Sequence, residues 1–116
     1  MDKDRPIEEV CALLKSLLKD DTNQIIFCTG RVEDYREKTI EQIKKILKGS
    51  KNIDIDSCLY MRPQGDFRKD LMVKRDLYKS MIFDGFNPVI VFEDKITVVE
   101  MWKEMGLKCL RVTGAQ

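Results

Sequence analysis

The sequence predicts an α/β domain built around a parallel β-sheet. Segments with apolar residues at helical spacing alternate with short apolar runs along all 116 residues, and the connections between them are short. The run PVIVFED, at 88–94, is almost entirely apolar, which is typical of a parallel strand covered on both faces. Because the chain contains no repeat, linker or low-complexity tract, we expect residues 1–116 to form a single domain.

Two helices and two strands are expected in the first half of the chain. Apolar residues from Ile7 to Leu18 form a helical stripe, and Asp4 is placed to cap that helix. The run QIIFCT predicts a strand, and helical spacing then returns as far as Gly49, a residue type that often follows the last helical turn. The expected elements are a helix from 4 to 18, a strand at 24–29, a helix at 32–49 and a strand at 58–61.

Two more helices and two more strands are expected in the second half. Asp70 is placed to cap the first of these helices, whose apolar face should consist mainly of Met72, Leu77, Met81 and Ile82. Met101 and Trp102 belong to the later helix, where we expect them in the core and not in a base-stacking platform. The expected elements are a helix at 70–83, a strand at 88–94, a helix at 95–106 and a strand at 108–112.

Composition excludes several classes of function. The net charge of +1 argues against a strongly basic nucleic-acid clamp, although a local basic cleft remains compatible with it. There is no apolar run long enough for a membrane span and no signal-peptide core, so we expect a cytoplasmic protein. The absence of histidine removes histidine general bases and most zinc chemistry. Four singly placed cysteines are expected to be buried thiols: Cys11, Cys28, Cys58 and Cys109.

Residues suited to phosphate and magnesium chemistry follow three of the expected strands. In parallel sheets the working site lies beyond the carboxyl ends of the strands. Hydroxyl and cationic groups suit a phosphoryl group, and carboxylate oxygens suit a hard cation. The residues at these three ends are Thr29, Gly30 and Arg31, then Arg62, then Glu93 and Asp94.

Three motifs resemble a known family. TGR followed by YREKT, the segment RPQGDFRKDLMVKRDLY, and the segment VIVFEDKITVVEMWKEMGLKCLRV together resemble the 3′-phosphatase domain of phage polynucleotide kinase. That domain is a member of the haloacid dehalogenase superfamily. The resemblance covers nearly the whole chain in the same order. It implies a Rossmannoid three-layer sandwich, in which a parallel sheet is flanked by helices.

The resemblance also implies a function and a role for each matching residue. The function is magnesium-dependent hydrolysis of phosphoesters at the 3′ ends of nucleic acid. Thr29 and Lys74 would be the catalytic groups, as the hydroxyl that contacts the phosphoryl oxygens and the lysine that balances charge. The phosphate-binding set would be Thr29, Gly30, Arg31, Arg62 and Lys74, and the magnesium-side acids Glu93 and Asp94.

Two features depart from the family pattern. The family usually has paired aspartates where this chain has Glu93 and Asp94, and the extra methylene shifts a ligand oxygen by about one ångström. The family's nucleophile motif, an apolar strand ending in D-x-D, is also missing. Asp2 and Asp4 have that spacing, but only Met1 precedes them. We therefore expect this chain alone to be inactive, with the aspartate motif either lost or supplied by another chain; hydrolysis would require the second.

Loss of the nucleophile strand should leave a truncated sheet of about four strands. The strands at 24–29 and 88–94 could pair directly, or another polypeptide or a second copy of the chain could fill the gap. We accordingly expect a homodimer or a complex with another protein. The ligand would be a phosphorylated nucleic-acid end or a nucleotide.

Two other functions were compared with this one. The chain could be a catalytically inactive phosphatase-like protein that binds a phosphorylated ligand, or a module whose exposed sheet edge recruits a protein partner. A cysteine phosphatase centred on Cys28 is disfavoured, because such enzymes need five residues between cysteine and arginine, and Arg31 and Arg36 do not fit that spacing.

Overall fold

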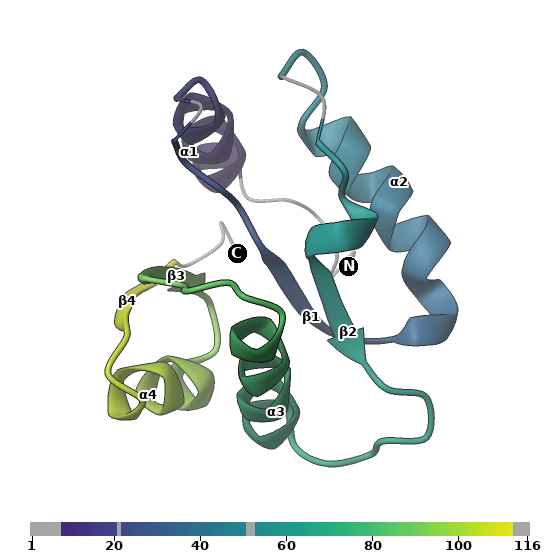
Figure 1. The fold of residues 1–116 in the computed structure, drawn as a ribbon, viewed down its shortest axis with the longest axis vertical. Helices are drawn as coiled ribbons and strands as arrows, with labels where there is room; N and C mark the ends of the chain where they lie inside the picture. Colours follow the sequence, from purple (N-terminus) through teal and green to yellow (C-terminus); the bar gives the residue numbers. More distant parts are fainter. Residues whose placement is uncertain (1–7, 21, 51–52, 113–116) are drawn as a thin grey trace.

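Helices and strands alternate along the chain in a computed structural model that describes residues 8–20, 22–50 and 53–112 (Figure 1). This alternation confirms the predicted α/β class. The predicted cap at Asp4, the helix start near Ile7 and the Asp2–Asp4 pair lie outside the described residues. The elements are α1 (Glu8–Leu18), β1 (Phe27–Val32), α2 (Arg36–Ile46), β2 (Leu59–Arg62), α3 (Asp70–Phe83), β3 (Ile90–Glu93), α4 (Ile96–Glu104) and β4 (Lys108–Arg111), with 3-10 turns at Glu33–Tyr35 and Asp56–Cys58.

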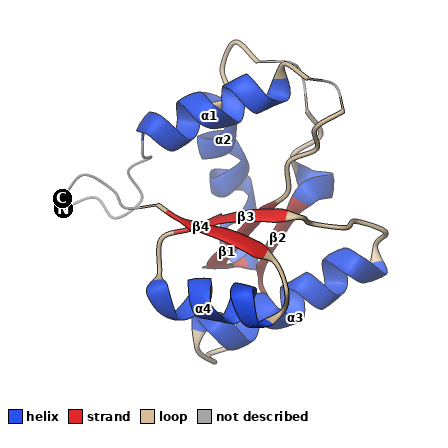
Figure 2. Cartoon of the chain, turned by 90° about the vertical axis from the view of Figure 1, so that its left-hand side faces the viewer, coloured by secondary structure: helices blue, strands red, loops and turns tan. Residues whose placement is uncertain are grey.

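The strands lie between two groups of helices. Figure 2 shows α1 and α2 on one side of the strands and α3 and α4 on the other. β1 pairs in parallel with β2, and β3 pairs in parallel with β4. Helix α3 packs against β1, β2 and α4, whereas α4 packs against β3 and β4. The two strand pairs are therefore connected chiefly through the helices beneath them.

The sheet is divided, which corrects the prediction of one four-stranded sheet. Within the described residues β1 is hydrogen-bonded to β2 alone and β3 to β4 alone, so the direct pairing suggested for 24–29 and 88–94 does not form. Among the described residues each pair consequently has two unpaired edges of backbone N–H and C=O groups, one on each strand. Such an edge is able to accept another strand.

The hydrophobic core is divided in the same way. The first cluster of buried side chains joins α1, α2 and β2 and consists of Leu18, Ile43, Leu47, Ile55, Leu59 and Met61. The second joins α4 and β4 and consists of Val98, Val99, Met101, Trp102 and Cys109. Met101 and Trp102 are thus confirmed as core residues. A domain of this size usually has one contiguous core, so the division matches the division of the sheet.

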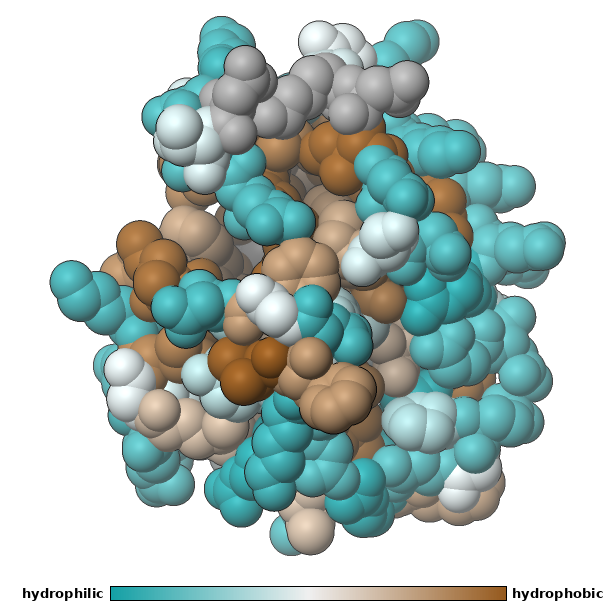
Figure 3. Space-filling view, viewed as in Figure 1, coloured by the Kyte–Doolittle hydropathy of each residue, from teal (hydrophilic) through white to brown (hydrophobic). Residues whose placement is uncertain are grey.

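Strand β3 is less buried than its apolar sequence predicts. Ile90 is 52% exposed and the preceding Val89 is 66% exposed, because β3 has a neighbour on only one side. Leu110, on β4, is also exposed. On the face drawn in Figure 3, hydrophobic residues are interrupted by hydrophilic ones and form no single continuous patch.

The first strand and the third helix differ in detail from the prediction. β1 begins at Phe27 and continues to Val32, so Thr29, Gly30 and Arg31, expected at the end of the strand, lie inside it, where its register with β2 is irregular. On α3 the buried apolar face repeats every four residues, which places Met72 and Ile82 on the exposed side. That buried face consists of Val73, Leu77 and Met81, with Lys74 beside them.

No helix in the described part of the chain is long and apolar enough to cross a membrane. The four cysteines are free thiols, as predicted, but only Cys58 and Cys109 are fully buried, whereas Cys11 and Cys28 are partly exposed.

The divided core predicts that truncations in the two clusters act independently. Ile55→Val in the first cluster should cost about 1 kcal/mol of unfolding free energy, and Val98→Ala in the second about 1–3 kcal/mol. Their costs should add to within roughly 0.5 kcal/mol, because the two side chains share no buried neighbours. Urea unfolding of the two single variants and the double variant measures this sum. A matched pair within one cluster, Ile55→Val with Leu59→Ala, should deviate from additivity.

Candidate functional site

Arg62 links the carboxyl ends of β1 and β2 to the loop that leads into α3. Its Nε donates to the carbonyl of Gly30 at 2.8 Å, and its Nη2 donates to Asp70 Oδ1 at 2.5 Å. Its Nη1 donates to the carbonyls of Asp66 and Arg68 at 2.9 and 2.7 Å. The Arg62 side chain is only 12% exposed. All three guanidinium nitrogens therefore have protein acceptors, and Arg62 fixes the relative positions of three segments.

Asp70 is the carboxylate at the centre of this arrangement. It is the first residue of α3, and its side chain pairs with Arg62 and with Lys95 and not with the backbone of its own helix. The predicted capping role is therefore wrong. The pKa of Asp70 is lowered from its usual value, chiefly by the hydrogen bond from Lys95. Partial burial of the carboxyl group raises the pKa and so opposes this effect. The same contact raises the pKa of Lys95.

Gly30 permits the close approach of α3 to β1. A Cβ atom placed on Gly30 would lie 2.8 Å from Asp70 Oδ1, which is closer than real Cβ contacts allow. The φ angle of Gly30 is not positive, so glycine is needed here for space and not for backbone conformation. Arg62 and Lys95 hold the Asp70 carboxylate in place and leave it little room to move away.

Lys74 and Glu93 form a buried ion pair between α3 and the end of β3. Lys74 Nζ lies 3.1 and 3.3 Å from the two carboxylate oxygens of Glu93, and the side chains are 11% and 7% exposed. Glu93 also accepts from Trp102 Nε1 at 3.3 Å and from the backbone N–H groups of Asp94 and Lys95. These additional donors satisfy the carboxylate, as a buried charge requires.

Thr29 and Arg31 lie on the opposite side of β1 from this pair. Side chains alternate along a strand, and Phe27 packs with the cluster of α1 and α2 while the Cα of Gly30 faces Asp70. Arg31 donates to Gln42 and Thr39 of α2 at 2.8 and 3.4 Å. Its backbone N–H donates to Thr29 Oγ1 at 3.2 Å. This bond lies in the irregular part of the strand, and it leaves the Thr29 O–H able to donate.

Two hollows border these residues. One, of about 440 Å³, lies between β1 and α2, and its wall includes Thr29, Arg31, Thr39 and Gln42. The other, of about 420 Å³, lies at the start of α3 and is lined by Arg62, Arg68, Lys69, Asp70, Leu71, Lys95 and Thr97. The second hollow brings together groups from the ends of β2 and β3, as expected for a site at the carboxyl ends of parallel strands.

Cys28 is not activated as a nucleophile. Burial raises the pKa of its thiol to about 12; the positive charge of Lys74 opposes this effect, whereas the charges of Glu93 and Asp70 add to it. The thiol therefore stays protonated at neutral pH, and only the thiolate is strongly nucleophilic. This agrees with the spacing argument against a cysteine phosphatase.

Comparison with known proteins identifies the family. The whole chain, residues 1–116, matches the model of the family described as the polynucleotide kinase PNKP phosphatase domain, of haloacid dehalogenase type. The chain belongs to this family. The resemblance found in the three motifs is thereby confirmed, and the divided α/β structure is compatible with the family's fold.

A viral relative supports the same assignment. A protein of Autographa californica nuclear polyhedrosis virus, provisionally described as a bifunctional polynucleotide kinase/RNA ligase, is 33% identical to this chain over 84 residues. The match covers 72% of this chain and 11% of the viral protein. The chain therefore corresponds to a small part of this relative's length.

Phosphatase domains of the haloacid dehalogenase type generally use Mg²⁺, but the described residues do not form a magnesium site by themselves. No group of three or more potential ligands among Asp, Glu, Cys and His comes together in the described ranges. The Glu93 carboxylate is already engaged by Lys74, Trp102 and two backbone N–H groups. Asp94 is exposed and is the better placed of the two acids to offer an oxygen. Magnesium takes six oxygen ligands, so water, substrate phosphate or further carboxylates would complete its coordination beside Asp94.

Asp70 and Lys95 are the site residues that sequence reasoning missed. Asp70 was interpreted as a helix cap, and Lys95 as the first residue of a helix. Lys95 comes two residues after β3, at the edge where Arg62 and Glu93 were also expected, and this was the available signal. Asp70 is eight residues from the end of β2 and gave no such signal.

Gly30→Ala should destabilise the domain by about 1–3 kcal/mol, because the added methyl group overlaps the Asp70 carboxylate. The cost should be smaller in an Asp70→Ala background, where that carboxylate is absent. Urea unfolding of the two single variants and the double variant gives the coupling energy. Equal costs of Gly30→Ala in both backgrounds would contradict the close approach.

Asp70→Asn should cost about 1–2 kcal/mol of stability near pH 7, since it removes the charge shared by Arg62 and Lys95. The pKa of Asp70 is lowered by folding, so its contribution is fully present above the unfolded value of about 3.9 and is lost as the pH falls through the lowered value. The difference in stability between parent and variant should accordingly shrink below about pH 4. Asp76→Asn, at an exposed position of the same helix, serves as the control and should cost less than about 0.5 kcal/mol.

Proposed function

We propose that this chain is the substrate-binding part of a polynucleotide 3′-phosphatase whose nucleophilic aspartate motif lies outside the described residues. The motif would occupy the interval between β1 and β3 as a parallel strand. The single observation that carries the proposal is the matching division of sheet and core at this interval. Membership of the phosphatase family gives the reaction class, hydrolysis of a phosphoester at a nucleic-acid 3′ end.

The geometry of the two strand ends supports this interval as the place of the motif. Thr29 lies in β1, and Glu93 ends β3 with its carboxylate held by Lys74. An inserted strand running parallel to both would bring its carboxyl end to the same edge. Its aspartates would then lie beside β1 and β3, with Thr29 on the α2 side of the strands and Lys74 on the α3 side. A carboxylate there would supply the nucleophile that this chain's four described strands do not provide.

In this proposal the residues of the chain bind and orient the substrate. The Thr29 O–H donates to a phosphoryl oxygen, and Lys74 offsets the negative charge that gathers around the reacting phosphorus. Arg31 contributes a positive charge from the α2 side. Arg62 acts as a positioning residue, because its donors already hold Gly30, Asp70 and the loop. Asp94 would offer this chain's oxygen ligand for magnesium once further carboxylates are present.

The proposal predicts that activity depends on the added strand. The chain alone should release no phosphate from a 3′-phosphorylated oligonucleotide in magnesium buffer. Addition of a polypeptide with about five or six apolar residues followed by D-x-D should produce release. The same polypeptide with asparagines in place of the aspartates should bind without producing activity. Lys74→Ala should abolish the release, whereas Lys79→Ala, at an exposed position of the same helix, should not change it.

Two results would contradict the proposal. Activity of the chain alone that is lost in Asp2→Asn or Asp4→Asn would place the nucleophile in the N-terminal pair. The second result is that the chain binds the oligonucleotide but does not hydrolyse it, even after the added strand has bound. If salt and Lys74→Ala weaken that binding, the chain is an inactive phosphatase-like binding protein.

A further inference from the structure

The loop between β2 and α3 forms a rigid arch over residues 66–68. The carbonyl groups of Asp66 and Arg68 flank Phe67, and both accept hydrogen bonds from the same nitrogen of Arg62, at 2.9 and 2.7 Å. The Asp66 carboxylate accepts from the backbone N–H and the guanidinium of Arg68. Arg68 also pairs with Asp76 of α3 at 2.8 Å. The backbone on both sides of Phe67 is therefore fixed to the body of the domain.

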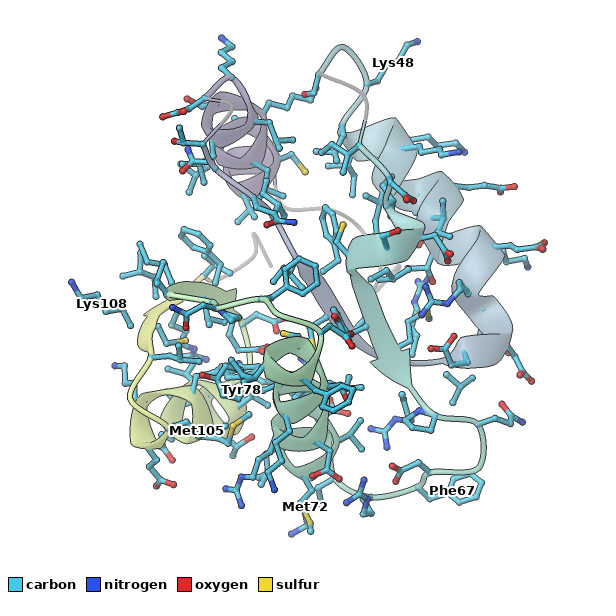
Figure 4. All side chains as sticks on the ribbon, viewed as in Figure 1. Lys48, Phe67, Met72, Tyr78, Met105 and Lys108 are labelled. Atoms are coloured by element: carbon cyan, nitrogen blue, oxygen red, sulfur yellow. The ribbon has the colours of Figure 1, made fainter. Side chains whose placement is uncertain are left out.

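Phe67 stands at the top of this arch and is exposed to solvent. Its relative exposure is 94%, and Figure 4 shows its ring at the outer edge of the loop. The carbonyls on either side point inward to Arg62, so the ring is held outward. An aromatic ring kept in this way presents both of its faces at little further entropic cost on binding.

Residues 66–68 adjoin the 420 Å³ hollow at the start of α3, near the carboxyl ends of β2 and β3. Phe67 is three residues from Asp70, so their Cα atoms are at most about 11 Å apart. The two residues that follow Phe67 are basic and line the 420 Å³ hollow together with Arg62 and Lys95. Asp66, Asp70 and Asp76 pair with Arg62, Arg68 and Lys95, so these residues together with Lys69 carry a small net positive charge. An exposed ring beside a positive charge has the composition of a single-strand binding surface, where charges follow the backbone and aromatic rings stack on bases.

We propose that Phe67 stacks on a nucleobase at the 3′ end of a single-stranded nucleic acid, while Lys69 contacts its backbone phosphates. This inference rests on the proposed function, since it assigns a binding position to the base next to the phosphate that the site would bind. The platform favours a nucleotide chain over inorganic phosphate or a sugar phosphate. It has no preference among bases, because every base offers a stacking face.

Binding of labelled oligonucleotides tests the platform without turnover. Fluorescence anisotropy is measured with a single-stranded oligonucleotide that carries a 3′-phosphate, and with the same strand whose 3′-terminal residue is abasic. The parent chain should bind the intact strand about tenfold more tightly than the abasic strand. Phe67→Ala should weaken binding of the intact strand by about the same factor and leave binding of the abasic strand unchanged.

Phe83 provides the matched control. It is 91% exposed and ends α3, about 20 Å along the helix from Asp70. Phe83→Ala should leave both affinities unchanged. Phe67→Trp should retain the preference for the intact strand, and the introduced indole should be quenched by the stacked base. The native tryptophan, Trp102, gives little interference because it is 3% exposed within the second core cluster.

The outcomes separate this inference from the proposed function. If Phe67→Ala lowers the affinity for the intact and the abasic oligonucleotide equally, or lowers neither affinity, the stacking platform is overturned and the phosphate site is left intact. An equal effect of Phe83→Ala would attribute the loss to general surface hydrophobicity and would also overturn it. Failure of the parent to bind either strand would overturn the phosphate site together with the platform.

Discussion

The hydrogen bonds of Arg62 are the constraint on which the site depends. One guanidinium group holds the carbonyl of Gly30 at the end of β1, the carboxylate of Asp70 at the start of α3 and two carbonyls of the intervening loop. Asp70 then holds Lys95, which follows β3. Because β1 and β3 do not pair, these side-chain contacts and the Lys74–Glu93 pair replace backbone bonds between the two halves. Helix α3 carries both contacts and so connects the two strand pairs.

The sequence was sufficient to predict the order and type of the elements. Apolar spacing located all four described helices, and the apolar runs located four strands, because these signals depend on local periodicity. Burial of Met101 and Trp102 was predicted for the same reason. The boundaries of β1 were wrong by about three residues, since the chain continues in the strand through Gly30 to Val32 with a local bond from the Arg31 N–H to Thr29 Oγ1. Such a local bond leaves no trace in apolar spacing.

The partners of charged residues could not be predicted from the sequence. Arg62 was expected to contact phosphate, and only the folded loop shows that protein carbonyls take up its donors. Asp70 has the features of a helix cap until Lys95, 25 positions later, is brought beside it. Glu93 and Asp94 are adjacent and chemically similar, yet one is buried against Lys74 and the other is exposed. These differences arise from contacts between distant parts of the chain, which periodicity does not encode.

The two core clusters have a consequence for the order of folding. Every residue of the first cluster and its packed neighbours falls between Leu14 and Met61, and every residue of the second falls between Leu71 and Cys109. Each cluster can therefore collapse from a continuous stretch of chain, with short loops to close. During synthesis the first would be complete before the second had left the ribosome. The two halves would then behave as separate cooperative units, distinguishable by the rates at which their backbone amides exchange with solvent.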